Sequence, residues 1–122
     1  MGFELEFIKH NSDYINGKYY IMGFDQDKLM KYNIKVNQVY LLSMLKQIIN
    51  EFDLETIVED GKVYYNVSPA QVILDNGIFY IHSRSYANKI VKPLYEKKFI
   101  IKANKKVMRS DCFIRLNIED LK

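Results

Sequence analysis

The stretch from Ser68 to Leu116 reads SPAQVILDNGIFYIHSRSYANKIVKPLYEKKFIIKANKKVMRSDCFIRL. It opens with Ser68-Pro69, which is typical of a helix start, because serine caps the first turn and proline fits the first helical position. The predicted helix is short, from Pro69 to Leu74, and ends near Asn76-Gly77, a pattern common at helix C-termini. The apolar residues 78–81 that follow predict an extended linker.

A longer helix is predicted from Ser83 to about Lys98. Four apolar residues recur at helical spacing and predict the face that meets the core. These residues are Ala87, Ile90, Val91 and Leu94. The opposite face carries polar side chains: Ser85, Asn88, Lys89 and Lys92, flanked by Arg84. Pro93 lacks a backbone N–H, so we expect a kink in the helix there.

Two strands are predicted after this helix, one beginning at Phe99-Ile100-Ile101 and its partner over residues 112–116. The loop between them is basic, and we treat residues 102–110 as one wing-like segment. Its cationic residues are Lys102, Lys105, Lys106 and Arg109. Such a loop is suited to following a phosphate backbone or entering a minor groove.

Upstream, the clearest helix runs from Val36 to about Phe52 and is apolar over most of its circumference, with Gln38 in a narrow polar stripe. A helix of that kind is usually surrounded by other elements or lends one side to a dimer. Asp60-Gly61 then predicts a tight turn, and Lys62–Val67 a strand.

The first 33 residues predict an extra pair of strands and a short helix. Residues 3–9 alternate between apolar and acidic, Asn16-Gly17 favours a turn, and residues 19–22 form a second strand. A short helix is expected over Asp25–Tyr32. The strand pair either offers an exposed edge to a second copy of the chain or covers the domain's own core, and both interpretations remain open.

From residue 34 to residue 117 the predicted order is helix, strand, short helix, turn, helix, strand, basic loop, strand. This is the order of a winged helix-turn-helix. We therefore predict an α+β fold of one domain over residues 1–122, with an N-terminal strand extension (1–33) and a winged-helix core (34–117).

Four short motifs carry a resemblance to a known family: DGKVYY at 60–65, SPAQVIL at 68–74, SRS at 83–85 and LYEKKFI at 94–100. Together they resemble the winged-helix domain at the front of replication initiators from plasmids and phages of low-GC Gram-positive bacteria. The resemblance covers about residues 34–117 and implies that the helix from Ser83 is the recognition helix. Phe99 stands where that family commonly has glycine. Similar winged helices serve partition adaptors, conjugation accessory proteins and repressors.

Composition restricts the classes of protein to consider. The chain has 122 residues, 48% hydrophobic and 27% charged, which suits one globular domain. No apolar run is long enough for a membrane span, and acids occupy the place of a signal peptide's bases. The single cysteine, Cys112, excludes an internal disulfide, which fits a reducing compartment. From these observations together we expect a cytoplasmic protein with no membrane partner. Fifteen lysines against three arginines, with 15 Ile, 10 Asn and 10 Tyr, indicate a low-GC genome.

Charge is divided unevenly along the chain. Residues 1–60 carry 6 lysines and 10 acids, for a net charge of −4, and residues 61–122 carry 12 bases and 5 acids, for +7. Residues 82–115 alone hold 10 bases and 2 acids. Such a block is expected of a surface that meets phosphate, although a solvated basic face has the same composition.

The sequence gives little support for a metal site, a cofactor site or an enzyme active site. The two histidines and Cys112 lack metal-ligand spacing, so we expect no metal and no cofactor. His82 is either a phosphate contact or a turn residue without a role. A nuclease site at Asp53 and Asp60-Gly61-Lys62 is weak, because Asp60-Gly61 is a better turn, and we expect no enzyme activity. Six tyrosines either stack on unpaired bases or belong to the core: Tyr19, Tyr20, Tyr64, Tyr65, Tyr80 and Tyr86.

Two functional hypotheses follow. The first is a dimeric, sequence-specific double-stranded DNA-binding protein of a mobile element, acting in plasmid replication, partition or transfer, or as a repressor. It would read DNA with the helix 83–98 and hold it with the wing 102–110. Its predicted contact residues are Ser83, Arg84, Ser85, Asn88, Lys89, Lys92, Lys102, Lys105, Lys106 and Arg109. The second is a winged-helix module that docks a replication or transfer partner protein without reading DNA.

Overall fold

The structure is a computed structural model that describes residues 13–15, 17–105 and 111–122. Within these residues the chain forms four α-helices and two antiparallel sheets, so the predicted α+β class is confirmed. The helices are α2 (Gln26–Lys31), α3 (Val36–Glu51), α4 (Pro69–Asp75) and α5 (Arg84–Glu96), with 3-10 turns η1 (Gly77–Phe79) and η2 (Glu119–Leu121).

Each sheet is built from short strands. The first sheet has the order β1-β2-β3, with β1 (Asp13–Ile15), β2 (Lys18–Ile21) and β3 (Phe24–Asp25). The second has the order β4-β5-β7-β6, with β4 (Thr56–Glu59), β5 (Lys62–Asn66), β6 (Ile100–Lys102) and β7 (Phe113–Leu116). From α3 to β7 the elements follow the predicted order, and β4 is an addition to it.

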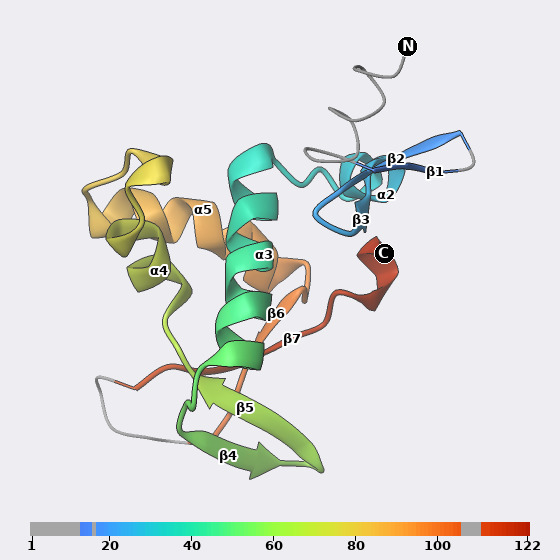
Figure 1. Cartoon of the computed structure of the whole chain (residues 1–122). Helices are drawn as coiled ribbons and strands as arrows, with labels where there is room; N and C mark the ends of the chain where they lie inside the picture. Colours follow the sequence, from blue (N-terminus) through green and yellow to red (C-terminus); the bar gives the residue numbers. More distant parts are fainter. Residues whose placement is uncertain (1–12, 16, 106–110) are drawn as a thin grey trace.

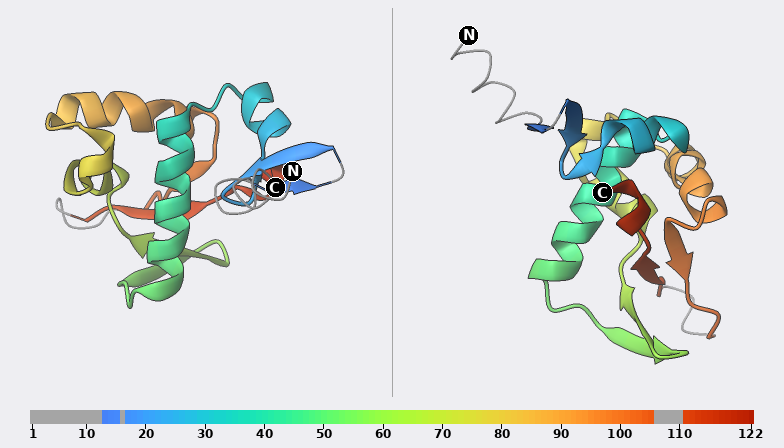
Figure 2. Two further views of the ribbon diagram at one scale, coloured as in Figure 1. Left: turned by 45° about the horizontal axis from the view of Figure 1, so that its top comes forward. Right: turned by 90° about the vertical axis from the view of Figure 1, so that its right-hand side faces the viewer.

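Helix α3 stands in the middle of the molecule. Figure 1 shows α4 on one side of it, α2 with the three-stranded sheet on the other, and α5 crossing behind it. In the right-hand view of Figure 2, α5 and β6 lie along the side of the molecule that is opposite α3. The core forms where these elements meet, and Leu41, Leu42 and Leu45 of α3 are fully buried in it.

Two residues of the α3 region differ from the sequence prediction. Phe52, expected on the apolar face, follows the end of the helix and is 63% exposed. Gln38, expected in the polar stripe, is buried, with 5% of its surface exposed. It is buried because both ends of its amide are satisfied: Oε1 accepts from the Lys35 N–H at 2.8 Å, and Nε2 donates to the Ile90 carbonyl of α5 at 3.0 Å.

The predicted helix caps of α4 and α5 are confirmed. The Ser68 hydroxyl accepts from the Gln71 N–H at 3.2 Å, and the Ser83 hydroxyl accepts from the Tyr86 N–H at 3.4 Å. All four apolar residues predicted on the inner face of α5 are buried. α5 extends through Pro93, and the missing proline N–H leaves the Lys89 carbonyl without its helical partner.

The linker between α4 and α5 is not extended, which corrects the prediction for residues 78–81. Residues 77–79 form η1, because the Asn76 carbonyl accepts from the Phe79 N–H and the Gly77 carbonyl accepts from the Tyr80 N–H. Tyr80 ends this turn in the left-handed region, with φ of 54°. Glycine or asparagine is the usual residue in that conformation, so a tyrosine there gave no signal in the sequence.

The N-terminal part matches the prediction at β2 and α2, whereas β1 and β3, which pair with β2 to form a three-stranded sheet, were not predicted. The strand predicted over residues 3–9 lies outside the described residues, whereas β2 and α2 correspond to the predicted second strand and short helix. Asp25 caps α2 by accepting from the Asp27 N–H at 2.9 Å. Burial alone would raise the pKa of Asp25, but backbone hydrogen bonds and the charge of Lys18 outweigh it and lower that pKa. The Lys28 ammonium binds the Lys122 carbonyl at 2.7 Å, which ties α2 to the C-terminal turn.

The Gln38 amide is testable by truncation. We expect Gln38→Ala to lower the free energy of unfolding by about 1–3 kcal/mol, because it removes two buried hydrogen bonds and leaves backbone groups unsatisfied. Gln47→Ala, on the same helix but exposed, should change stability by less than about 0.5 kcal/mol. Urea unfolding followed by circular dichroism measures both. Equal losses in the two variants would contradict the assigned role of Gln38.

Candidate nucleic-acid interface

The outward face of α5 is polar and exposed, as predicted. Ser85, Asn88 and Lys89 are all exposed, and none of the three forms a side-chain hydrogen bond or ion pair with another described residue. These side chains project from one face of the helix, at spacings of three and four residues. Hydroxyl, amide and ammonium groups in this arrangement are free to meet an external ligand.

The other two predicted residues of α5 have partners within the protein. The Arg84 guanidinium donates to Oε1 of Gln71 on α4, and Gln71 in turn donates to Asp75 at 2.7 Å. Lys92 lies 3.8 Å from the Glu96 carboxylate, and both side chains are largely exposed. An exposed pair of this kind contributes little stability and separates easily. Arg84 is more firmly placed, because it connects the two helices.

The wing begins on an anchored stretch of backbone. The Glu59 carboxylate, at the end of β4, accepts from the Asn104 N–H at 2.9 Å and from the Lys105 N–H at 2.7 Å. Both Lys102 and Lys105 are exposed, and the Lys102 ammonium lies 6.0 Å from the centre of the Tyr95 ring. Lys106 and Arg109, the other two predicted wing residues, lie outside the described residues.

The chain is held again where it returns from the loop. The Asn66 side chain donates to Asp111 at 3.1 Å and accepts from the Cys112 N–H at 3.0 Å. Cys112 is half-buried rather than fully buried, with its sulfur 3.9 Å from the Tyr95 hydroxyl. Burial, together with this sulfur, raises the pKa of Tyr95 above its ordinary value.

Glu59 and Asn66 were missed by the sequence analysis. Each lies in the strand pair around Asp60-Gly61, far along the chain from the loop it holds. The turn itself was predicted correctly, and Asp60 and Gly61 take positive φ values, 53° and 75°. A strand residue that faces a distant loop leaves no local signal, because its partners are set by the register of β5, β7 and β6.

The structure places α5 and β6, the strand from which the wing begins, next to each other. β6 follows α5 directly and contacts it, and the right-hand view of Figure 2 places both elements on the same side. Arg115, which contributes to the basic block, is different. It is half-buried on β7, with its guanidinium 5.8 Å from the Tyr64 ring. It therefore packs against the sheet and does not extend the α5 face.

The Glu59 contacts predict how the wing is positioned. In Glu59→Ala the N–H groups of Asn104 and Lys105 lose their charged acceptor, so we expect their hydrogen exchange to accelerate by about tenfold or more. Glu55→Ala, which removes a nearby exposed acid, should leave these two amides unchanged. Residue-resolved exchange measured by NMR tests this. Unchanged exchange in Glu59→Ala would show that another interaction holds the loop.

Comparisons with protein-family models, with curated proteins and with solved structures found no match to this chain. Among the described residues, no group of three His, Cys, Asp or Glu side chains is placed to hold a metal ion. In the same part of the chain, no helix combines the length and apolar character that crossing a bilayer requires. The function of the interface is therefore inferred from its own geometry.

Proposed function

We propose that this chain is a sequence-specific double-stranded DNA-binding protein with a winged helix-turn-helix fold. The observation that carries the proposal is the free polar face of α5, with Ser85, Asn88 and Lys89, on a helix that contacts β6, the strand that leads into a lysine-rich loop with an anchored start. The sheet order supports the fold, because β7 pairs with both β5 and β6 and the basic loop connects β6 to β7.

In this proposal α5 enters the major groove. An asparagine amide pairs bidentately with adenine, and a lysine or arginine pairs with guanine. Asn88 and Lys89 are free to make such contacts. Arg84 keeps further donors after its bond to Gln71, since a guanidinium has five. Ser83 and Ser85 lie at the start of the helix, where hydroxyl groups commonly contact phosphate.

The wing serves affinity rather than sequence reading. Lys102 and Lys105 are exposed cations on a loop whose backbone is held by Glu59. Each cation that meets a phosphate releases condensed counterions, which favours binding to any duplex. Lys106 and Arg109 of the same loop would add to this effect.

The biological role belongs to the same proposal. We assign the chain to a mobile element, as a replication, partition or transfer accessory factor or a repressor, on the strength of its composition and motifs. Two copies would read two half-sites, because one small helix reads few base pairs and dimers multiply specificity. A cytoplasmic location accords with such a role.

A second candidate function, docking of a partner protein, is favoured by exposed apolar side chains near the start of α3. Val36 is 70% exposed and Ile78 is 60% exposed. Exposed apolar groups that gather on one surface mark interaction sites more often than isolated ones do. This module would leave the α5 face unused, so tests on α5 and the wing distinguish the two functions.

Sequence reading is tested with duplexes selected from a random pool. We expect the wild type to enrich one sequence, and Asn88→Ala to lose about 1–3 kcal/mol of discrimination between that duplex and a random one. Asn50→Ala, an exposed asparagine on α3, is the matched control and should keep full discrimination. Fluorescence anisotropy measures all three proteins. Failure of the wild type to enrich any sequence would refute sequence-specific binding.

Phosphate binding is tested by salt dependence. The double variant Lys102→Ala with Lys105→Ala should weaken binding to the specific duplex and to a random duplex alike. The slope of log affinity against log salt should become shallower by about 0.9 for each phosphate that is no longer neutralised. The donor to Glu59 at position 105 is the backbone N–H, so Lys105→Ala keeps that bond and the loop stays anchored. The double variant Lys28→Ala with Lys31→Ala, on α2, removes the same charge elsewhere, and an equal effect there would contradict a role specific to the wing.

A further inference from the structure

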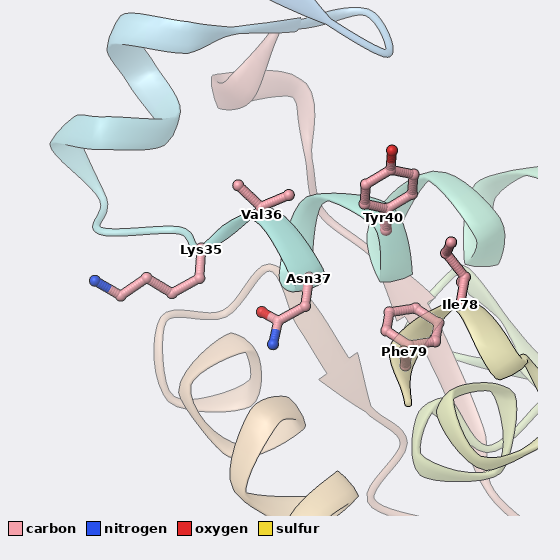
Figure 3. A pocket seen from close by; sticks show the side chains of 6 residues that line it. All are labelled: Lys35, Val36, Asn37, Tyr40, Ile78 and Phe79. Atoms are coloured by element: carbon pink, nitrogen blue, oxygen red, sulfur yellow. The ribbon is translucent and has the colours of Figure 1, made fainter. Parts of the chain in front are cut away.

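A hollow of about 430 Å³ opens between η1, the start of α3 and the first turn of α5. Its volume falls within the range of small-ligand sites, about 300–1,000 Å³. Its lining combines aromatic rings with a few polar groups: Asn37, Phe79, Tyr80, Ile81, His82, Ser83 and Tyr86. It shares Asn37 and Phe79 with the neighbouring apolar pocket drawn in Figure 3.

Two tyrosine rings stand open to solvent at this hollow. Tyr80 is 83% exposed and Tyr86 is 57% exposed, and neither pairs with another aromatic ring of the described residues. Tyr80 also takes the left-handed backbone conformation, which is unfavourable for a bulky side chain. The Tyr80 backbone closes η1 by donating to the Gly77 carbonyl, while its ring stays in solvent and is accessible to a ligand.

The remaining lining residues supply a floor and a polar edge. Ile81 is buried and Phe79 is half-buried, so the base of the hollow is apolar. The Asn37 side chain makes no hydrogen bond to another described residue, and Figure 3 shows its amide in the first turn of α3, where it lines both pockets. An amide offers both a donor and an acceptor, so it can form a hydrogen bond with the polar edge of any base.

The electrostatic surroundings favour an anionic ligand. No acidic residue is among the described residues that line the hollow. The N-terminus of α5 opens at its edge through Ser83, and Arg84 is the next residue. Helix N-termini and arginines both attract phosphate. Open aromatic rings, a free amide and positive surroundings together match a nucleotide better than an apolar peptide.

We propose that this hollow binds an unpaired nucleobase, stacked on Tyr80 with Tyr86 beside it, from a single-stranded segment next to the duplex held by α5. This rests on the proposed function, because α5 supplies the neighbouring duplex site. Base stacking on aromatic side chains tolerates any base. The single-strand site therefore adds affinity for unpaired DNA without adding sequence preference.

The first test uses fluorescence. The chain contains no tryptophan, so Tyr80→Trp introduces a single reporter at the hollow. We expect short single-stranded oligothymidine to quench its fluorescence saturably, since a stacked base contacts the indole ring. Tyr19→Trp, on the distant strand β2, is the matched control and should not be quenched. Absence of quenching at position 80, or equal quenching at both positions, would overturn the proposal.

The second test measures affinity. Tyr80→Ala with Tyr86→Ala should weaken binding of the same oligothymidine by about fivefold to 150-fold, the loss expected for one base-on-aromatic stack. Tyr80→Phe keeps the ring and should retain most of the affinity. Circular dichroism checks that each variant is folded. Unchanged strand affinity in the folded alanine variant would also overturn the proposal.

Duplex binding is measured in parallel, which separates the two proposals. If the wild type binds duplex with the salt dependence described above but not oligothymidine, the hollow proposal fails and the proposed function stands. If it binds oligothymidine through Tyr80 but binds no duplex, the proposed function fails and the hollow remains a single-strand site.

Discussion

One buried amide determines how the two longest helices meet. Gln38 accepts from the backbone at the start of α3 and donates to the Ile90 carbonyl in the middle of α5. The same side chain closes the first turn of α3 and binds the backbone of α5, so it adds a directional contact at the point where the two helices pack. The apolar contacts around it are non-directional and leave more freedom. The exposed face of α5, and the hollow beside its first turn, therefore depend on this amide.

A second constraint acts on the loop between β6 and β7. Its first residues are held by Glu59 and its last by Asn66, so two distant strand residues define both ends of a basic segment. This gives a reason for β4, which the predicted order of elements lacks. β4 lies at the opposite edge of the sheet from β6, and its last residue, Glu59, supplies the carboxylate that binds Asn104 and Lys105. That carboxylate binds backbone N–H groups, and leaves the Lys102 and Lys105 ammonium groups available.

Helix caps and turns, which depend on neighbouring residues, could be predicted from the sequence, whereas contacts between residues far apart in the chain could not. Ser68, Ser83 and Asp60-Gly61 act within a few residues of themselves, so their caps and turn were predicted correctly. Gln38 looked like any polar residue on a helix, because its partner in α5 is 52 positions away. Lys98 is a similar case: it takes the left-handed conformation after α5, with φ of 66°, in a place where glycine would have signalled the helix end. Of the predicted interface, the α5 face lies on the surface as expected, while the ties of Arg84 to Gln71 and of Lys105 to Glu59 depend on folding.

The position of Pro93 bears on which part of α5 would contact bases in the proposed function. The proline sits in the last turn, and the carbonyl it leaves unpaired belongs to Lys89. Ser85, Asn88 and Lys89 all precede it, so the free polar face lies on the regular part of the helix, adjacent to the hollow at Ser83. In the proposed arrangement, the paired bases read by α5 and the unpaired base held at Tyr80 lie at the same end of one helix. That geometry suits a junction between duplex and single strand better than a continuous duplex. A protein built in this way would gain most affinity where DNA strands separate, which accords with a role at a replication or transfer origin more closely than with simple repression.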